Sequence, residues 1–153
     1  MATHQAAAGV VVMNRSGLVL MVDTVRRGPD RLVLPGGVIE LDESPAAAAE
    51  REVLEETGLH VCVSRLLAVA PRERSASRPS GLRFIFDTET VADDVVLVPQ
   101  LDEVNELLWL APDEAIARHV HPGGPTLEQA LVVRDRAQCS AYLDAERVLE
   151  PGS

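Results

Sequence analysis

The chain has 153 residues, 46% of them hydrophobic and 25% charged, and these values predict one compact domain over residues 1–153. Its two cysteines stand far apart and outside any Cys/His cluster, which argues against structural zinc and a disulfide framework. The formal net charge is −10 and all 14 basic residues are arginine, a balance that disfavours polynucleotides and anionic membranes. Without a leader-like basic segment or an apolar stretch of about 20 residues, we expect a cytoplasmic protein.

The N-terminal part of the chain predicts two paired strands and a short third strand. The apolar runs Ala8–Met13 and Leu18–Val22 are separated by the turn-forming group Asn14–Gly17, and this pattern predicts a β-hairpin. After a loop, the short strand Leu32–Leu34 ends at Pro35 and two glycines, which permit a tight backbone path.

A well-delimited helix follows over Pro45–Thr57. Ser44 supplies the N-cap, the proline stands at the first helical position, and Gly58 follows the last turn as a C-terminal stop. The residues in between are strong helix formers, so both ends of this helix are predicted from the sequence.

Strands dominate the middle of the chain. We expect two long strands, His60–Ala70 and Leu82–Val91, joined by the polar, arginine-bearing loop Pro71–Gly81. Val95–Val98 and Leu107–Leu110 are candidates for shorter strands.

The C-terminal part predicts a short helix that starts at Ala111 and a longer helix from Thr126 to Leu149. With helices placed between and after the strands, the sequence favours an α/β fold in which helices cover the faces of a mixed β-sheet.

Three glutamates share one side of the first helix. Glu52, Glu55 and Glu56 are spaced i, i+3 and i+4, so their carboxylates project within a single turn and repel one another. Oxygen ligands at this density suit Mg²⁺ or Mn²⁺, and the absence of a nearby His or Cys disfavours zinc. Taken alone, such a face is more often simply a solvated helix surface.

The residues around this helix carry a more specific signal. The segment GVIELDESPAAAAEREVLEETGL, from Gly37 to Leu59, has the specified residue at every position of the Nudix box. These positions are Gly37, Glu43, Arg51, Glu52, Val53, Glu55, Glu56, Gly58 and Leu59. The chain therefore resembles the Nudix hydrolase family, and the order of its elements is also similar. The resemblance implies a Nudix-type α/β/α sandwich, dependence on Mg²⁺ with Mn²⁺ as a candidate substitute, and hydrolysis of a diphosphate linkage.

The resemblance also implies roles for the box residues. Glu52, Glu55 and Glu56 become candidate metal ligands, together with the carbonyl oxygen of Gly37. Arg51 would orient the carboxylates. Metal-activated water would attack one phosphorus, with Glu52 or Glu55 helping to remove its proton.

Outside the box, the candidates keep their structural alternatives. Glu103 is a candidate loop base or metal ligand, or else an exposed acidic residue in the turn before a strand. Arg27, Arg72 and Arg74 are candidates for binding a substrate phosphate, but the loop Pro71–Gly81, which carries the last two, has the polar composition of a solvated loop. Arg83 belongs to the same concentration of basic residues.

Two loop residues ahead of the helix are ambiguous. Asp42 stands where many relatives carry glycine, which raises the question of whether the loop keeps the same path. Glu43 is either a residue that tunes metal binding or one that holds the loop by pairing with Arg51.

The resulting hypothesis is a pyrophosphohydrolase that cleaves the diphosphate of a nucleoside diphosphate linked to another group, as in nucleoside triphosphates, ADP-ribose or nucleotide sugars. One alternative is a nucleotide-sensing module that binds without turnover, although an intact box argues against it. Another is hydrolysis of a non-nucleotide diphosphate such as an isoprenoid or inositol compound. The partner expected is a small nucleotide-like molecule. A homodimer is compatible with the sequence, which does not set the oligomeric state.

Overall fold

The structure of the protein is a computed structural model that describes residues 4–25, 32–74, 76, 79–119, 126–136, 141–143 and 148–149. The strands are β1 (Ala7–Val11), β2 (Val19–Thr24), β3 (Leu32–Val33), β4 (Gly36–Val38), β5 (Val63–Arg72), β6 (Gly81–Thr88), β7 (Val104–Leu110), β8 (Ala141–Leu143) and β9 (Val148–Leu149). The helices are α1 (Pro45–Thr57), α2 (Pro112–Arg118) and α3 (Thr126–Asp135).

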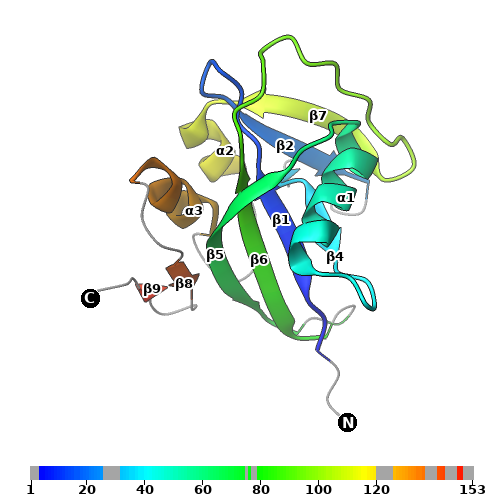
Figure 1. The fold of residues 1–153 in the computed structure, drawn as a ribbon, viewed down its shortest axis with the longest axis vertical. Helices are drawn as coiled ribbons and strands as arrows, with labels where there is room; N and C mark the ends of the chain where they lie inside the picture. The colour runs from blue at the N-terminus through cyan, green and yellow to red at the C-terminus, as the bar shows by residue number, and fades with distance from the viewer. Residues whose placement is uncertain are drawn as a thin grey trace.

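The larger sheet is mixed, as the sequence predicts. Its strand order is β4-β1-β6-β5-β8-β9, with β1 parallel to β6, β5 parallel to β8 and the other neighbours antiparallel. A second, antiparallel sheet has the order β3-β2-β7. Figure 1 shows α1 on one side of these strands and α2 and α3 on the other. Helices on both sides of a mixed sheet confirm the predicted α/β architecture.

Two apolar cores lie on opposite sides of β1, because successive side chains of a strand point to opposite faces. One core packs α1 against β1 and β2, and its fully buried members are Ala8, Val10, Val12, Leu20, Ala48, Ala49 and Val53. The other core packs α2 and α3 against the opposite face and includes Val11, Met21, Leu67, Ile85, Ala115 and Leu127. Each helix is therefore held to the sheets by its own apolar contacts.

The ends of α1 match the prediction at both residues. The Ser44 hydroxyl accepts a hydrogen bond from the Ala47 N–H at 3.2 Å. Gly58 adopts φ +75° in the left-handed region, and its N–H donates to the Leu54 carbonyl at 2.9 Å. Local capping chemistry fixes the start and the end of the helix that carries the acidic residues.

The predicted β-hairpin forms only next to its turn, where the Leu20 N–H donates to the Val12 carbonyl at 2.9 Å. The Gly17 N–H donates to the Asn14 carbonyl at 3.0 Å, and one bridge joins Met13 to Val19. Beyond that bridge, β1 enters the larger sheet and β2 enters the smaller one. Both strands are apolar along most of their length, so each needs packing partners on two faces, which a hairpin with one solvated face does not supply.

The predictions for the later segments need three corrections. Residues 95–98 form no strand; they are irregular, and the Val98 N–H donates to the Thr57 carbonyl at 2.8 Å. The predicted helix Thr126–Leu149 ends at Asp135, and strands β8 and β9 follow it. The predicted loop Pro71–Gly81 is shorter, because β5 continues through Arg72. In each case long-range pairing or its absence outweighs the local pattern.

A buried carboxylate ties the larger sheet to α3. Asp87 on β6 is 6% exposed and pairs with Arg134 of α3 at 2.8 Å and with Arg65 of β5 at 3.4 Å. Arg65 also donates to the Arg134 carbonyl at 2.8 Å. Within the described part of the chain, no helix has the length and apolar composition needed to cross a membrane.

The cap of α1 gives a first testable prediction. We expect Gly58→Ala to lower the free energy of unfolding by about 2 kcal/mol, because the new Cβ would add a left-handed backbone penalty and would lie 3.0 Å from the Cβ of Val98. Gly17→Ala is the matched control, since Gly17 has φ +79° but nothing within 4 Å of an added Cβ, and should cost about 1 kcal/mol. Equal losses in urea-induced unfolding of the two variants would contradict the role of Val98.

Candidate active site

The acidic side of α1 lies against β4, the short strand that precedes it. A Cβ added to Gly37 would collide with the carboxyl group of Glu52, so a glycine at this position lets the glutamate rest directly on the backbone. Glu56, one helical turn after Glu52, accepts a hydrogen bond from the Gly36 N–H at 3.0 Å. The two glycines ahead of the helix therefore set the approach of both carboxylates to the sheet.

Glu56 is a buried carboxylate with little compensation. It is only 6% exposed, and burial raises its pKa from 4.5 to about 8. The Gly36 N–H opposes this rise, whereas the negative charges of Glu52, Glu103 and Glu55 add to it. A site that keeps this group ionised at neutral pH has to provide a nearby positive charge.

Glu52 is similarly enclosed, with a side chain that is 13% exposed. Burial raises its pKa above the ordinary value, and the adjacent Arg51 guanidinium, which donates a hydrogen bond at 2.9 Å, opposes that effect. Glu55 is different, because its side chain is 48% exposed and reaches Arg51 at 3.2 Å. The three predicted carboxylates thus differ sharply in their contact with solvent.

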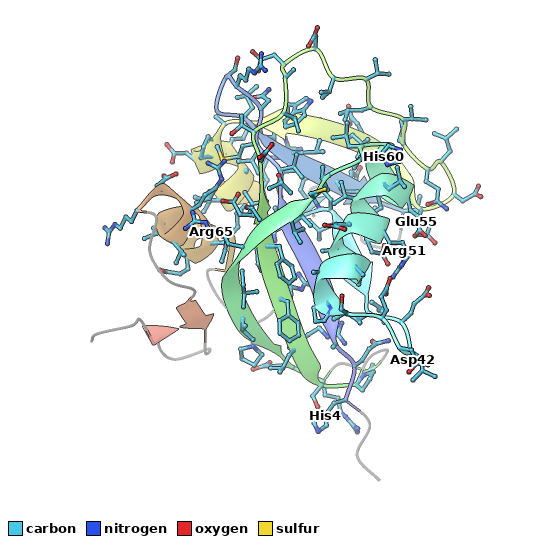
Figure 2. The ribbon with its side chains drawn as sticks, viewed as in Figure 1. His4, Asp42, Arg51, Glu55, His60 and Arg65 are labelled. Atoms are coloured by element: carbon cyan, nitrogen blue, oxygen red, sulfur yellow. The ribbon has the colours of Figure 1, made fainter. Side chains whose placement is uncertain are left out.

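Arg51 connects the acidic residues of the helix to the loop before it. Its Nε and one terminal nitrogen bind both oxygens of Glu43, at 2.8 and 3.0 Å, and the same terminal nitrogen donates to the Val38 carbonyl at 3.1 Å. The other terminal nitrogen binds Glu52 and Glu55. Figure 2 shows Arg51 and Glu55 projecting from α1 on the same side. This network lowers the pKa of Glu43 to about 2 and raises that of Arg51.

The structure shows the backbone conformation of Asp42 and the contacts of Glu43, the two ambiguous residues of the loop before the helix. Asp42 has φ +63°, in the left-handed region that glycine occupies readily and that aspartate tolerates better than most residues. Glu43 pairs with Arg51 and also accepts the Glu40 N–H at 3.0 Å. Holding the loop is therefore what Glu43 does in this structure.

The carboxylates of Glu52 and Glu56 open onto a cavity of about 610 Å³. Glu52, Glu56 and Glu103 line it together with the backbone of Gly36 and Gly37. Glu103 is exposed and precedes β7; its carbonyl accepts the Val25 N–H at 3.1 Å. The structure therefore brings this loop glutamate to the same cavity as the helix carboxylates, as one of the two interpretations of its sequence requires.

The predicted arginines separate into distinct groups. Arg72 lines the cavity, and it is not a loop residue as expected but the last residue of β5, 5% exposed. Its guanidinium donates to the main-chain and side-chain oxygens of Gln5 at 2.9 and 3.0 Å. Arg74 is exposed and is not among the residues that line the cavity, so its role in substrate binding stays a prediction. Arg27 lies outside the described residues.

Arg83 and Gln5 complete the far end of the cavity. The alternating pattern of β6 could have pointed to Arg83, because it lies two residues before Ile85 and so shares a face with a buried core residue. Gln5 carried no sequence signal, since its position depends on long-range contacts such as the hydrogen bond from its N–H to the Ser80 carbonyl at 3.1 Å.

The residues on the glutamate side of the cavity have the donor atoms that bind a hard divalent cation. They offer carboxylate and carbonyl oxygens, the donors preferred by magnesium and manganese. They also carry more negative charge than the single guanidinium of Arg51 neutralises. Over the described ranges, no three His, Cys, Asp or Glu side chains already converge as metal ligands. With Arg51 drawing Glu52 and Glu55 towards itself, a bound cation would require these side chains to adjust.

Comparison with known proteins agrees with this geometry. The family model described as NUDIX domain matches residues 3–130. The chain belongs to the Nudix family. A MutT-like protein of Streptomyces ambofaciens is 41% identical over 122 residues, covering 75% of this chain and 69% of that protein. Human diphosphoinositol polyphosphate phosphohydrolase 3-alpha is 37% identical over 104 residues, which are 67% of this chain and 60% of that enzyme. The aligned part thus spans less than two thirds of the human relative.

Solved Nudix structures share the fold. A NUDIX hydrolase from Nitrosomonas europaea has a TM-score of 0.68 at 24% identity, with 99% of this chain and all of that chain covered. The E. coli dihydroneopterin triphosphate pyrophosphohydrolase has a TM-score of 0.70 at 19% identity, covering 84% and 94% of the two chains. Family membership and fold confirm the predicted Nudix hydrolase, a class of pyrophosphohydrolases that generally use a divalent metal.

The burial of Glu56 gives a prediction for the metal-free protein. Between pH 4.5 and about 8, the folded state holds a proton that the unfolded state has lost, so the free energy of unfolding should fall as the pH rises through this window. Glu56→Gln removes this dependence. In EDTA at pH 9, we expect the variant to be more stable than the wild type by on the order of 2 kcal/mol.

Denaturant unfolding followed by the fluorescence of Trp109 at pH 5 and pH 9 measures this difference. Glu114→Gln is the control, because Glu114 is a half-exposed glutamate on α2 that pairs only with Arg118 among the ion pairs of the described residues. A stability gain for Glu56→Gln that is the same at both pH values would show that titration of the buried carboxyl is not its cause.

Proposed function

We propose that this Nudix protein hydrolyses the diphosphate linkage of a nucleoside diphosphate joined to another group, using magnesium, for which manganese can substitute. The observation that carries the proposal is the pair of enclosed carboxylates, Glu52 and Glu56, that rest on Gly36 and Gly37 and open onto a cavity of about 610 Å³. Cavities of roughly 300–1,000 Å³ accommodate small molecules of nucleotide size.

The cation would be held by Glu52, Glu56 and the carbonyl oxygen of Gly37, with Glu55 joining when it leaves Arg51. When bound, such an ion supplies positive charge at the diphosphate oxygens and Lewis acidity towards water. The protein holds the carboxylates in a defined orientation and spacing. Arg51 orients Glu52 and Glu55 through its hydrogen bonds, and the capped helix keeps their spacing. Both features reduce the reorganisation needed when substrate binds.

Two groups can accept the proton of the attacking water. Glu52, and behind it Glu55, stand on the rigid helix but share hydrogen bonds with Arg51. Glu103 lines the same cavity from the loop before β7. We propose Glu52 as the acceptor on the helix and keep Glu103 as the alternative on the loop; comparison of Glu52→Gln with Glu103→Gln separates them.

A second candidate is a non-nucleotide diphosphate that carries several phosphates. The specific support is the arginine-lined end of the cavity, formed by Arg72 and Arg83, together with the similarity to a human enzyme named for diphosphoinositol polyphosphates. A sensor that binds without turnover is less well supported, since Arg51 and every box glutamate are retained.

A substrate panel tests the proposed activity. With Mg²⁺ we expect cleavage at the diphosphate of at least one nucleotide among nucleoside triphosphates, ADP-ribose, NADH, dinucleoside polyphosphates and nucleotide sugars, with products identified by mass. Excess EDTA should abolish it. Glu56→Gln should lower kcat by about 100-fold or more because it removes a carboxylate from the cation side, with an unchanged circular-dichroism spectrum.

Glu114→Gln on α2 is again the control and should retain wild-type kcat. Binding of a nucleotide without turnover would favour the sensor, whereas cleavage restricted to a diphosphoinositol compound added to the panel would favour the second candidate. Full activity of Glu56→Gln, or undiminished activity in EDTA, would contradict the proposed metal site. Hydrolysis in ¹⁸O-labelled water then identifies which phosphorus is attacked.

A further inference from the structure

The cavity carries opposite charges at its two ends. Arg72 and Arg83 are the cationic side chains among the described residues that line it, and Glu52, Glu56 and Glu103 are the acidic ones. The positive end is conspicuous in a chain whose formal net charge is −10. Its charge has no role in holding a divalent cation, because like charges repel.

Strand register places the two ends at a defined separation. Val38 on β4 and Arg83 on β6 pair with the same residue of β1, Ala7, from its two sides. They are therefore two strand spacings apart, roughly 10 Å. Gly36 and Gly37, which contact the acidic residues, belong to the β4 side of this row. Arg83 and the glycines that contact the acidic residues thus lie on opposite edges of β1, an arrangement that suits a ligand with two separated anionic groups.

The positive end is built into the fold. Arg72 is 5% exposed, and Gln5 fixes its guanidinium by accepting hydrogen bonds through two oxygens, at 2.9 and 3.0 Å. Both of these acceptors belong to Gln5, so these bonds fix the orientation of the guanidinium. A guanidinium held in a cavity wall acts on an anion through a lower effective dielectric than one in water, and it matches the geometry of phosphate oxygens.

Small residues of β1 lie between the two ends of the cavity. Ala7, Ala8 and Gly9 of β1 line the cavity between the strand that bears Gly36 and the strand that bears Arg83. We propose that Arg72 and Arg83 form a second anion subsite, which binds a phosphate of the substrate outside the diphosphate that is cleaved. This inference rests on the proposed function and narrows it to substrates with an additional phosphate, on the ribose or on the attached group.

Binding of nucleotides that cannot be hydrolysed at an anhydride provides the test. AMP is compared by calorimetry, with Mg²⁺ present, with adenosine 2′,5′-bisphosphate and adenosine 3′,5′-bisphosphate. For the wild type, at least one bisphosphate is expected to bind about 10-fold more tightly than AMP, in line with one charge-assisted contact. Arg83→Gln should reduce this ratio to below about 3-fold. Arg74→Gln, which removes an exposed arginine outside the cavity, should preserve it.

Arg72→Lys and Arg72→Gln extend the test to the buried partner, with thermal unfolding to monitor the fold. If Arg72 only braces Gln5, Arg72→Gln lowers the Tm but leaves the ratio of the bisphosphate to AMP unchanged. That result, an unchanged ratio in Arg83→Gln, or bisphosphates that bind wild type no better than AMP would each overturn the subsite. None of these ligands contains a diphosphate linkage, so their binding is measured independently of hydrolysis. If the protein cleaves no compound of the substrate panel but still binds a bisphosphate more tightly than AMP, the proposed hydrolysis is overturned and the subsite stands.

Discussion

Glu56 is buried between α1 and β4, with one main-chain N–H at 3.0 Å and three other glutamates close enough to raise its pKa. Burying a carboxylate in such surroundings costs stability, and the rest of the structure is arranged so that it can be tolerated. The helix that carries it is capped at both ends and packed along Ala48, Ala49 and Val53. Fraying of the helix therefore cannot bring the Glu56 carboxylate into contact with solvent.

Arg51 limits the repulsion but does not remove it. It contacts Glu43, Glu52 and Glu55, and in the part of the chain that the structure describes Glu56 has no ion-pair partner. Its strongest contact, with both oxygens of Glu43, points away from the cavity and towards the loop. The guanidinium thus braces the loop and helix, and the negative charge that remains faces the cavity. One arginine can therefore orient the acidic residues without neutralising all of their charge.

Local rules predicted α1 to the residue, because Ser44, Pro45 and Gly58 act through contacts within their own turn. They failed for β1 and β2, whose separation into two sheets depends on cores on both faces, and for β8, which pairs in parallel with β5 far along the chain. No local signal encodes such partners. The family resemblance supplied the fold, but not which strand neighbours would line the cavity.

The same contrast holds within the site. The helix spacing placed Glu52, Glu55 and Glu56 on one side correctly, yet it could not show that Glu55 is half exposed while Glu56 is buried. That difference arises from the way β4 packs against the helix, which the spacing of the glutamates along the helix does not encode. Likewise Arg72 and Arg74 look equivalent in a polar segment, and only the extension of β5 through Arg72 buries one and exposes the other.

Strand β1 contacts both the acidic and the basic end of the site, because its two faces and its two edges have different neighbours. Ala8 and Val10 pack against α1, and Ala7 and Gly9 are among the residues that line the cavity. On one edge β1 pairs with β4, which holds the acidic end; on the other it pairs with β6, which bears Arg83. The placement of the acidic and basic residues on opposite edges of β1 is thus set by the backbone register of one strand.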